Sequence, residues 1–523
     1  MVALGTRAPE PGARQQDRFA RLLHAEWTKF RTVRGWIILT LVAVALPTVF
    51  ALLNNSSCGG SACAAPPTGP GGEAVTDQFS FVHRALAGDG SITVRITSLT
   101  GLMPGSVASS GAAGQSPTAG WAPHLEPWSK AGLIISASAR PGSAYAAMMV
   151  TGQHGVRMQW NYTGDIAGQG GTVTATAPHW LRLTRHGDTI TGYDSADDAS
   201  WTTVGTVTLT RLPATVQAGL FATSPEHGVT LSQSVIGNSN TLVATQDTGT
   251  FDQLSLGGSW PGGGWAGSDI GDTGGPTGLD TYRQAGGRFT VSGSGDIAPY
   301  VAGQLGAGAR IEDAISVGSF AAVIAAGVLG ALFITAEYRR GLIRITLAAS
   351  PRRGRLLAAK AIVIGAVTFA AGLAGVAIAL PVGLNRLRDG NNPILAVTGL
   401  TELRVIVGAA AVIAVCAILA LAIGAVLRRG AFAVTAVIAG VVLPYLLAIT
   451  ALPLGAADWV LRITPAAAIA VEQSVPAYPQ VTAAYTPASG YYPLAPWAGF
   501  AVLCGWTVAA LALAAFLLRR RDA

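Results

Sequence analysis

Six long apolar runs constrain this chain more than any other feature of its sequence. Each run approaches or exceeds about 20 residues, the length that an α-helix needs to cross the hydrocarbon core of a bilayer. Half of the 523 residues are hydrophobic and only 12% are charged. The runs are Trp36–Leu53, Ala314–Thr335, Leu356–Val382, Val405–Leu427, Ala431–Gly455 and Pro496–Leu518. We therefore predict an α-helical membrane protein with six transmembrane helices.

The basic residues predict the orientation of these helices in the plasma membrane. Seven Lys and Arg residues precede the first run, and seven more lie between Arg339 and Lys360. The loops on the opposite side hold four, namely Arg386, Arg388, Arg404 and Arg462. Because cytoplasmic loops carry an excess of positive charge, we expect a multi-pass protein with both termini in the cytoplasm. The first run follows some 35 residues that lack a cleavage site, so we expect it to be a retained helix.

The segment from Asn54 to Asp313 separates the first run from the second and contains no apolar run. It carries 11 Lys and Arg residues against 18 Asp and Glu residues, whereas the rest of the chain carries 23 against 9. The insert thus has a formal charge of −7 (11 − 18) and the rest of the chain +14 (23 − 9), so all of the excess positive charge lies in the membrane half. We expect no nucleic-acid partner, and we expect residues 54–313 to be extracellular.

Short alternating segments in this insert predict β-strands. Apolar and polar residues alternate in Ser91–Leu99 and in Gly155–Tyr162. Trp180–Arg185 and Thr189–Tyr193 are joined by His186-Gly187-Asp188, a suitable hairpin turn. The pattern predicts an extracellular all-β sandwich inserted between the first two transmembrane helices.

Three stretches of the insert resemble the concanavalin-like jelly-roll domains of bacterial surface proteins. They are GDGSITVRITSL at 88–99, WSKAGLIISAS at 128–138 and WLRLTRHGDTITGYDSADDASWTTVG at 180–205. In such domains a strand similar to GGRFTVSGSGDIA usually comes first, but here it comes last, at 286–298. We therefore predict a circularly rearranged domain whose last strand lies beside the early ones.

The insert offers two kinds of candidate site. Asp194, Asp197 and Asp198 are closely spaced, but the E-x-D-x-x-E pattern of glucanases with this fold is missing, so we interpret them as turn residues. Aromatic residues on the predicted strands either stack on the sugar rings of an envelope glycan or belong to the core. These aromatic residues are Trp160, Tyr162, Trp180, Tyr193 and Trp201.

The four cysteines predict no metal site, because no spacing among them is typical of zinc ligands. Cys416 and Cys504 lie within apolar runs, where a small and weakly polar side chain fits. Cys58 and Cys63 follow the first helix on the oxidising side, where they are either free or joined in a short disulfide loop.

Two stretches of the membrane half contain sequence patterns that the positive charge of cytoplasmic segments does not explain by itself. In residues 1–35, before the helix at 36–53, apolar residues at helical spacing predict an amphipathic helix at 17–34. In residues 314–523, which hold helices two to six, the loop at 336–355 contains a short helical stretch and a Ser-Pro break. A basic loop facing lipid phosphate would explain its charge but not this order of residues.

EYRRGLIRITLAASPRRGRLLAAK at 337–360 closely resembles the cytoplasmic loop of ABC-2 type transporter permeases of high-GC Gram-positive bacteria, and AEWTKFRTVRGW at 25–36 supports the resemblance. In that family the loop supplies a coupling helix that fits a cleft on the ATPase subunit. The resemblance implies that Glu337, Tyr338, Arg339, Arg340, Gly341, Arg344 and Thr346 form this contact. It also implies that Ser350, Pro351, Arg352 and Arg353 set the turn back into the membrane.

The sequence lacks a G-x-x-x-x-G-K-[ST] loop, so we expect no ATP hydrolysis and no cofactor bound by this chain itself. The resemblance implies an ATPase subunit that uses ATP and a second permease copy or paralogue. Few charges lie in the middle of the runs, which favours a lipophilic or amphipathic cargo over an ion, and we expect this cargo to be exported. The alternatives are a membrane-tethered surface-binding or sensing protein and, less favoured, a membrane-anchored glycosidase.

Overall fold

The computed structural model divides the chain into a helical unit and a β unit. It describes residues 11–58, 65–104, 120–168, 171, 173–174, 177–231, 239–271, 281–301, 308–339, 353–483 and 485–520. The helical unit comprises Met1–Cys58, Ala309–Pro476 and Tyr485–Ala523, and the β unit comprises Gly59–Gly308 and Ala477–Ala484. The β unit is thus slightly shorter than the predicted segment 54–313. It also takes residues 477–484 from the loop before the last helix, which the sequence did not indicate.

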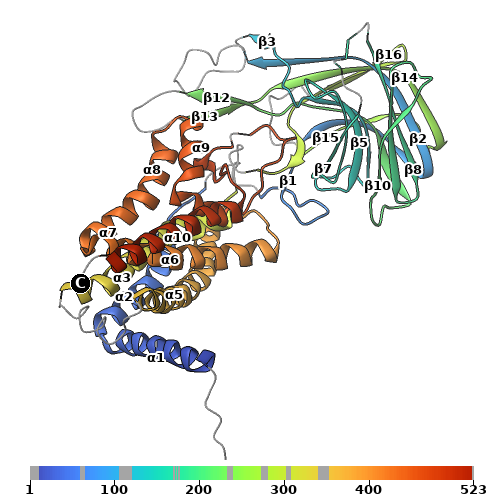
Figure 1. Cartoon of the computed structure of the whole chain (residues 1–523). Helices are drawn as coiled ribbons and strands as arrows, with labels where there is room; N and C mark the ends of the chain where they lie inside the picture. The colour runs from blue at the N-terminus through green and yellow to red at the C-terminus, as the bar shows by residue number, and fades with distance from the viewer. Residues whose placement is uncertain are drawn as a thin grey trace, which may run out of the picture. The chain divides into compact units, whose positions relative to one another are not determined.

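Six helices among the described residues are long and apolar enough to cross a membrane. They are α2 (Arg34–Leu53), α3 (Ser316–Arg339), α5 (Arg353–Asp389), α6 (Gly399–Leu427), the combined α7–η3–α8 helix (Gly430–Thr450) and α10 (Pro496–Arg520). All six coincide with the apolar runs, which confirms the predicted helical membrane part. In Figure 1 they pack side by side, preceded by α1 (Pro11–Thr32).

The fifth span ends earlier than predicted, before Pro453, and its helix is irregular near Pro444. Its C-terminal half, α8 (Leu443–Thr450), ends five residues before the expected Gly455. Pro453 causes this early end, because a residue before proline avoids the helical conformation and Pro453 itself caps α9 (Leu454–Ile463). A π-helical turn, η3 (Ile438–Val442), widens the helix just before Pro444.

The loop before α10 contains a sharply bent pair of short helices. The α9 helix is followed by η4 (Pro465–Glu472), and their axes differ by 98°. Two further short helices, η2 (Ile311–Ala314) and η5 (Pro487–Ser489), precede α3 and α10.

Small residues bring the central helices of this unit into close contact. The α3 helix packs on α6, and a Cβ atom added at Gly330 would lie 2.1 Å from the carbonyl oxygen of Ala417. The core of the unit is apolar, with residues such as Leu329 and Phe333 fully buried. The many Gly and Ala residues of the spans thus permit backbone approach, as helix packing in membranes requires.

The β unit contains 18 strands among the described residues. They are β1 (Val75–Asp77), β2 (Phe79–Pro104), β3 (Trp121–Pro123), β4 (Lys130–Ser136), β5 (Tyr145–Thr151), β6 (Val156–Trp160), β7 (Gly164–Ala167), β8 (His179–His186), β9 (Thr189–Ser195), β10 (Thr202–Thr208), β11 (Thr215–Thr223), β12 (His227–Leu231), β13 (Ser239–Val243), β14 (Gln246–Ser259), β15 (Ala266–Ile270), β16 (Thr281–Ala285), β17 (Arg288–Gly293) and β18 (Ile297–Pro299). The predicted strands correspond to parts of β2, β6, β8 and β9. Gly187 has a φ of +58° in the hairpin turn, as expected.

The long strand β2 connects the two layers of the sandwich (Figure 1). Its first part, Phe79–Ala87, pairs with β11 and β15, and its second part, Gly90–Leu102, pairs with β8 and β14. Gly88 lies between these parts with a φ of +69°, a conformation that only glycine adopts readily. The strand can therefore bend and pass from one layer to the other.

The interior between the two layers is apolar and includes Val82, Ile92 and Leu183. A second apolar cluster, including Phe81 and Tyr145, lies on the other face of β4, β5 and β11 under β1 and β18. These layers confirm the predicted sandwich. The pairing of β1 with β18 confirms that the end of the stretch at 286–298 lies beside an early strand, whereas β17 pairs with the late strands β14 and β16.

Candidate functional site

Two lysines and two glutamates form a buried charge network at one end of the helical unit. Lys360 on α5 donates hydrogen bonds to Glu26 on α1 and Glu337 on α3, both at 2.7 Å. Lys29 on α1 donates to Glu26 at 2.9 Å and to Glu337 at 3.1 Å. The network thus joins three helices, and its formal charge is zero.

The network is stabilised by its burial and by its balance of charge. The side chains of Lys360 and Glu26 are each 1% exposed, and that of Glu337 is 8% exposed. Charges at such depth persist only when they are paired and hydrogen bonded, because their desolvation costs several kcal/mol each. Removing any one charge would leave another buried charge without its partner.

Aromatic side chains surround the lysine end of the network. The Lys360 ammonium lies 4.7 Å from the ring centroid of Phe333, within reach of a cation–π interaction. Trp36 and Phe30 pack edge-on against Phe333, with ring centroids at 5.0 and 6.0 Å. The same cluster therefore holds the start of α2 against α3.

Lys29 is the most exposed member of the network, at 39%. Burial by itself would lower the pKa of Lys29, but the hydrogen bond to Glu26 and the charge of Glu337 raise it above its usual value. Lys29 therefore stays charged at neutral pH and balances the second carboxylate.

The network lies where the predicted coupling loop leaves and re-enters the helical unit. The α3 helix ends at Arg339, and α5 begins at Arg353. Glu337 holds the first end to α1 and α5, while Arg353 donates a hydrogen bond through Nη1 to the carbonyl oxygen of Leu518 on α10. The Tyr338 ring packs under Arg428, 5.4 Å from the guanidinium carbon. Both ends of the loop are thus attached to other helices.

The structure revises one predicted role within this loop. Glu337 is only 6% exposed and is bound by two lysines, so its carboxylate positions the loop and does not face outward toward an ATPase. Arg339 is described in its backbone alone. Arg340, Gly341, Arg344, Thr346, Ser350, Pro351 and Arg352 lie outside the described residues, and their roles stay predictions.

Sequence reasoning missed three members of the network, Glu26, Lys29 and Lys360. Two positions in the sequence could have indicated the network. Glu26 lies beside the apolar face of the predicted amphipathic helix, and Lys360 lies at the start of an apolar run. Because both residues lie on helix faces that must be buried, their opposite charges are best explained as an ion pair. Glu26 is 1% exposed and Phe30 is 5% exposed, whereas Trp27 at 44% remains outside the core.

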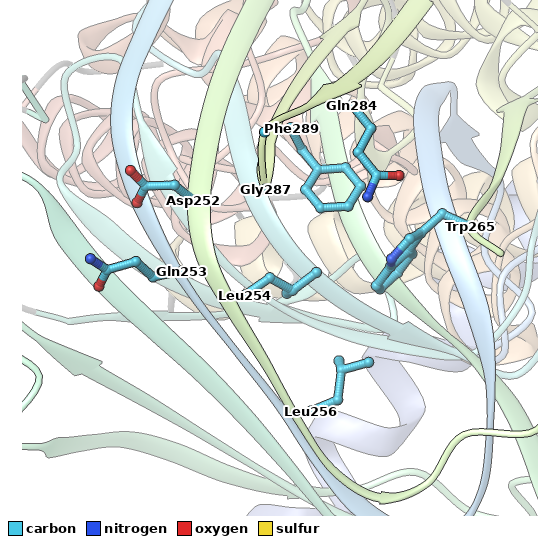
Figure 2. A pocket seen from close by; sticks show the side chains of 9 residues that line it. Asp252, Gln253, Leu254, Leu256, Trp265, Gln284, Gly287 and Phe289 are labelled. Carbon is cyan, nitrogen blue, oxygen red and sulfur yellow. The ribbon is translucent and has the colours of Figure 1, made fainter.

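A second candidate site is a groove of about 610 Å³ in the β unit. It is lined by Asp252, Gln253, Leu254, Leu256, Trp265, Gln284, Gly286, Gly287 and Phe289. Figure 2 shows the apolar side chains of Leu254, Phe289 and Trp265 gathered on one side of Asp252 and Gln253. The Trp265 and Phe289 rings meet edge to face, with their centroids 5.6 Å apart.

The polar side of the groove is held in place by a strand irregularity. The register of β14 against β2 shifts between Asp252 and Ser255, and Gln253 has a φ of +52° with its side chain exposed. Arg95 donates two hydrogen bonds to Asp252, at 2.7 and 2.8 Å, and these hold the pKa of Asp252 below its usual value. The groove thus combines the amide of Gln253, the fixed carboxylate of Asp252 and the aromatic ring of Trp265. Such groups in one groove are suited to binding a polar ring such as a sugar.

The five aromatic residues predicted to stack on sugars do not form one site. Tyr162 is 1% exposed and donates a hydrogen bond to Asp77 at 2.7 Å, so its prediction as a stacking residue is wrong. Trp160 packs against the interior of the sandwich. Trp180 and Tyr193 are partly exposed, and Trp201 is covered on one face by Arg182 at 3.8 Å. The groove uses Trp265 in their place, which sequence reasoning overlooked.

Asp197 and Asp198 lie in a turn, as predicted, whereas Asp194 lies in strand β9, so its prediction as a turn residue is wrong. Asp197 accepts hydrogen bonds from the backbone N–H groups of Ser200 and Ala199, which lower the pKa of Asp197 to about 2. Asp198 has a φ of +61° in the same turn, while Asp194 is buried within β9. This arrangement agrees with local hydrogen bonding by turn aspartates.

Of the cysteines, Cys58 is in a disulfide, whereas Cys416 and Cys504 carry free thiols. Cys63 lies outside the described residues, so its pairing with Cys58 stays a prediction. Cys416 is fully buried, in agreement with a packing role.

The six spans, the basic loops and the charge network around one loop define a multi-pass membrane protein of the transporter type. A family model described as ABC-2 family transporter protein matches residues 207–523, which is more than half of the chain. The chain therefore belongs to the ABC-2 transporter family and is a membrane permease subunit of an ABC transporter. Membership also implies an ATPase subunit as partner and places the protein in the plasma membrane.

Other comparisons add little. No curated protein matches the chain. Among solved structures, a functionally unknown protein from Saccharomyces cerevisiae is 14% identical over 35% of this chain and 75% of its own, with a TM-score of 0.18. A GH43 protein from Bacillus licheniformis is 14% identical over 33% and 28%, with a TM-score of 0.18. Scytalido-glutamic peptidase is 8% identical over 41% and 98%, with a TM-score of 0.23. These scores are too low to support an argument.

Proposed function

We propose that this chain is the permease subunit of an ATP-driven exporter of a lipophilic or amphipathic compound, energised by a separate ATPase subunit. The observation that carries the proposal is the buried network of Glu26, Lys29, Glu337 and Lys360. It joins the amphipathic helix α1 to both helices that flank the predicted coupling loop. A movement of a loop that is attached in this way would be transmitted to α3 and α5 together.

The mechanism follows from this attachment. An ATPase that binds the loop at 340–352 and moves during its cycle would pull on α3 through Glu337 and on α5 through Lys360. Because the four charges cannot separate without exposing an unpaired buried ion, α1, α3 and α5 move as one body. The excess of basic residues around the loop supports a cytoplasmic position for it, where ATP is available. Two such permeases and two ATPases would complete the transporter.

The experiment is affinity purification of the tagged protein from its native membrane, followed by mass spectrometry and an ATPase assay. We expect a stoichiometric ATPase subunit whose association is lost in the double variant Arg340→Ala with Arg344→Ala. Arg388→Ala is the matched control, because Arg388 is exposed at the predicted outer side and its guanidinium donates a hydrogen bond to the nearby Asn385 of the same helix. Retained association in the double variant would disprove the role of the loop. A well-folded preparation without any ATPase would favour the membrane-tethered receptor.

We further propose that the β unit is extracellular and binds an envelope glycan in the groove around Trp265. The support is chemical: Trp265 offers a ring face, and Gln253 and Asp252 offer hydrogen-bonding groups beside it. The test is co-sedimentation of the purified protein with isolated cell-wall polysaccharide. Trp265→Ala should weaken binding about tenfold or more, since a ring contact is worth about 1 to 3 kcal/mol. Trp201→Ala is the control, and equal loss in both variants would contradict the proposal.

A further inference from the structure

Three side chains of metal-ligating type converge in the β unit, away from the groove and the charge network. His124 and Glu126 lie in the connection from β3 to β4, and His227 is the first residue of β12 (Figure 1 labels β3 and β12). The Nε2 atom of His124 and the Nδ1 atom of His227 lie 2.7 and 2.6 Å from the same oxygen, Oε1 of Glu126. All three ligand atoms lie within 4.8 Å of one another.

The burial of the cluster is uneven in a way that suits a metal. The Glu126 side chain is 3% exposed, whereas the two imidazoles are 34% and 32% exposed. Backbone hydrogen bonds fix the segment that carries the carboxylate. The N–H group of Ser129 donates to the backbone carbonyl oxygen of Glu126 at 3.0 Å, and the N–H group of His124 donates to that of Gly101 at 3.0 Å. The carboxylate therefore approaches from inside the protein, and the imidazoles flank it at the surface.

The imidazole rings are also arranged around one point. They meet edge to face, with centroids 4.9 Å apart and an interplanar angle of 76°. In the structure, Nε2 of His124 and Nδ1 of His227 each form a hydrogen bond with Oε1 of Glu126. A metal would be bound by the same three atoms, with the proton of each neutral imidazole carried on its other nitrogen.

We propose that His124, Glu126 and His227 form a zinc site. Two imidazole nitrogens and one carboxylate oxygen form a ligand set that Zn²⁺ accepts with a water molecule in the fourth position, whereas Ca²⁺ and Mg²⁺ prefer oxygen ligands alone. Zinc–ligand bonds of about 2.0 to 2.2 Å in a tetrahedron place the ligand atoms about 3.3 Å apart. Each nitrogen–oxygen distance would then lengthen by about 0.6 Å, which rotation of two partly exposed imidazoles supplies.

Zinc at this position would connect two segments that are distant in the sequence. The β12–β13 hairpin forms a two-stranded sheet of its own, separate from the large sheet. Such a ribbon has little stability by itself, so a metal bond between its first residue and the β3–β4 connection would hold it to the sandwich. The site is independent of ATP coupling and of the proposed glycan groove.

The test uses the full-length protein, purified in detergent through a tag without histidine and stripped with a chelator. Zinc chloride is added, and the bound metal is measured by mass spectrometry after gel filtration and by competition with a chromophoric chelator. We expect about one zinc per chain for this three-ligand site. Loss of a ligand in His124→Ala, His227→Ala or Glu126→Gln should weaken binding by at least about 100-fold, more than the roughly 10- to 100-fold of an outer-shell loss.

The matched control is His186→Ala, because His186 is also hydrogen bonded to one carboxylate, that of Asp89, but belongs to no cluster of three ligands among the described residues. His186→Ala should bind zinc as the unaltered protein does. Zinc should raise the thermal midpoint of the unaltered protein and of this control only. Glu126→Gln keeps the volume of the side chain and its hydrogen-bond acceptor, so it serves if the alanine variants fail to fold.

Two results would overturn the proposal. One is an unaltered protein that retains no zinc above the buffer level, which would leave the three residues as a hydrogen-bonded cluster only. The other is zinc binding that survives unchanged in Glu126→Gln and in a folded histidine variant. A cobalt-loaded protein with the visible absorption of a four-coordinate ion, lost in the same variants, would support the proposal by a separate measurement.

Discussion

Replacement of Lys360 by methionine tests the charge network most directly. Methionine fills the space of the lysine stem but removes its charge, and so leaves Glu26 and Glu337 with Lys29 as their remaining partner. Removal of one member of a buried ion pair typically destabilises a protein by about 3 to 5 kcal/mol. Because Lys29 still hydrogen bonds both carboxylates, we expect the lower end of this range, about 3 kcal/mol, for the separation of α1 from α3 and α5.

The assay is hydrogen–deuterium exchange of the slowest α1 amides, in the full-length protein reconstituted in lipid. Since each 1.4 kcal/mol is a factor of ten in an equilibrium constant, Lys360→Met should speed this exchange by about 100-fold. Lys29→Met is the control: Lys29 is 39% exposed, and its loss should cost at most about 1 kcal/mol.

The reasoning would be refuted if the two variants exchanged at equal rates, or if Lys360→Met left the α1 amides unchanged. A variant that removes all three inner charges together, Lys360→Met with Glu26→Gln and Glu337→Gln, should recover much of the loss. Such a recovery is expected because no unpaired buried charge would remain.

Three further predictions concern other parts of the fold. Burial raises the pKa of Asp77 to about 6, above the usual aspartate value of 3.8. The β unit should therefore become more stable by up to about 2 kcal/mol as pH falls from 7 to 4, and Asp77→Asn should abolish this dependence in exchange measured at β1 and β18. Gly330→Ala should force α3 from α6 and lower the thermal midpoint, at a cost of about 1 to 3 kcal/mol, whereas Gly327→Ala meets only ordinary contacts and should not. Limited proteolysis should fail to release 240–300 from a folded 77–236, because strands of both segments pair with each other.

The helical half of the fold was predictable because a bilayer demands long apolar helices. The length of each span and the charge of its flanks are properties of single segments, so all six could be read from the sequence. The end of the fifth span was misplaced because an apolar run continues past Pro453, whose effect on the backbone is local. The sandwich was also predictable in class, since alternation in segments such as Ser91–Leu99 reflects one buried face.

Partners that are far apart in the sequence were not predictable in the same way. Glu26 and Lys360 are 334 positions apart, and no local pattern says that two such charges meet. Tyr162 was misjudged because alternation gives the face of a strand but not whether a second layer covers that face. Here β1 and β18 cover it, and the hydroxyl is bound by Asp77. Trp265 was overlooked because its stretch is rich in glycine and has little strand pattern.

The presence of residues 477–484 in the β unit changes how many attachments this unit has to the membrane spans. Within the unit, Gln480 donates a hydrogen bond to the carbonyl oxygen of Thr163, so this segment is fixed to the sandwich itself. The chain therefore passes between the two units four times, whereas a domain inserted in a single loop would be attached only twice. Along the chain, these four connections follow α2, precede η2 and α3, follow η4, and precede η5 and α10. A force on the β unit would therefore be carried by four covalent connections, to the bent helix pair and α10 as well as to α2 and α3.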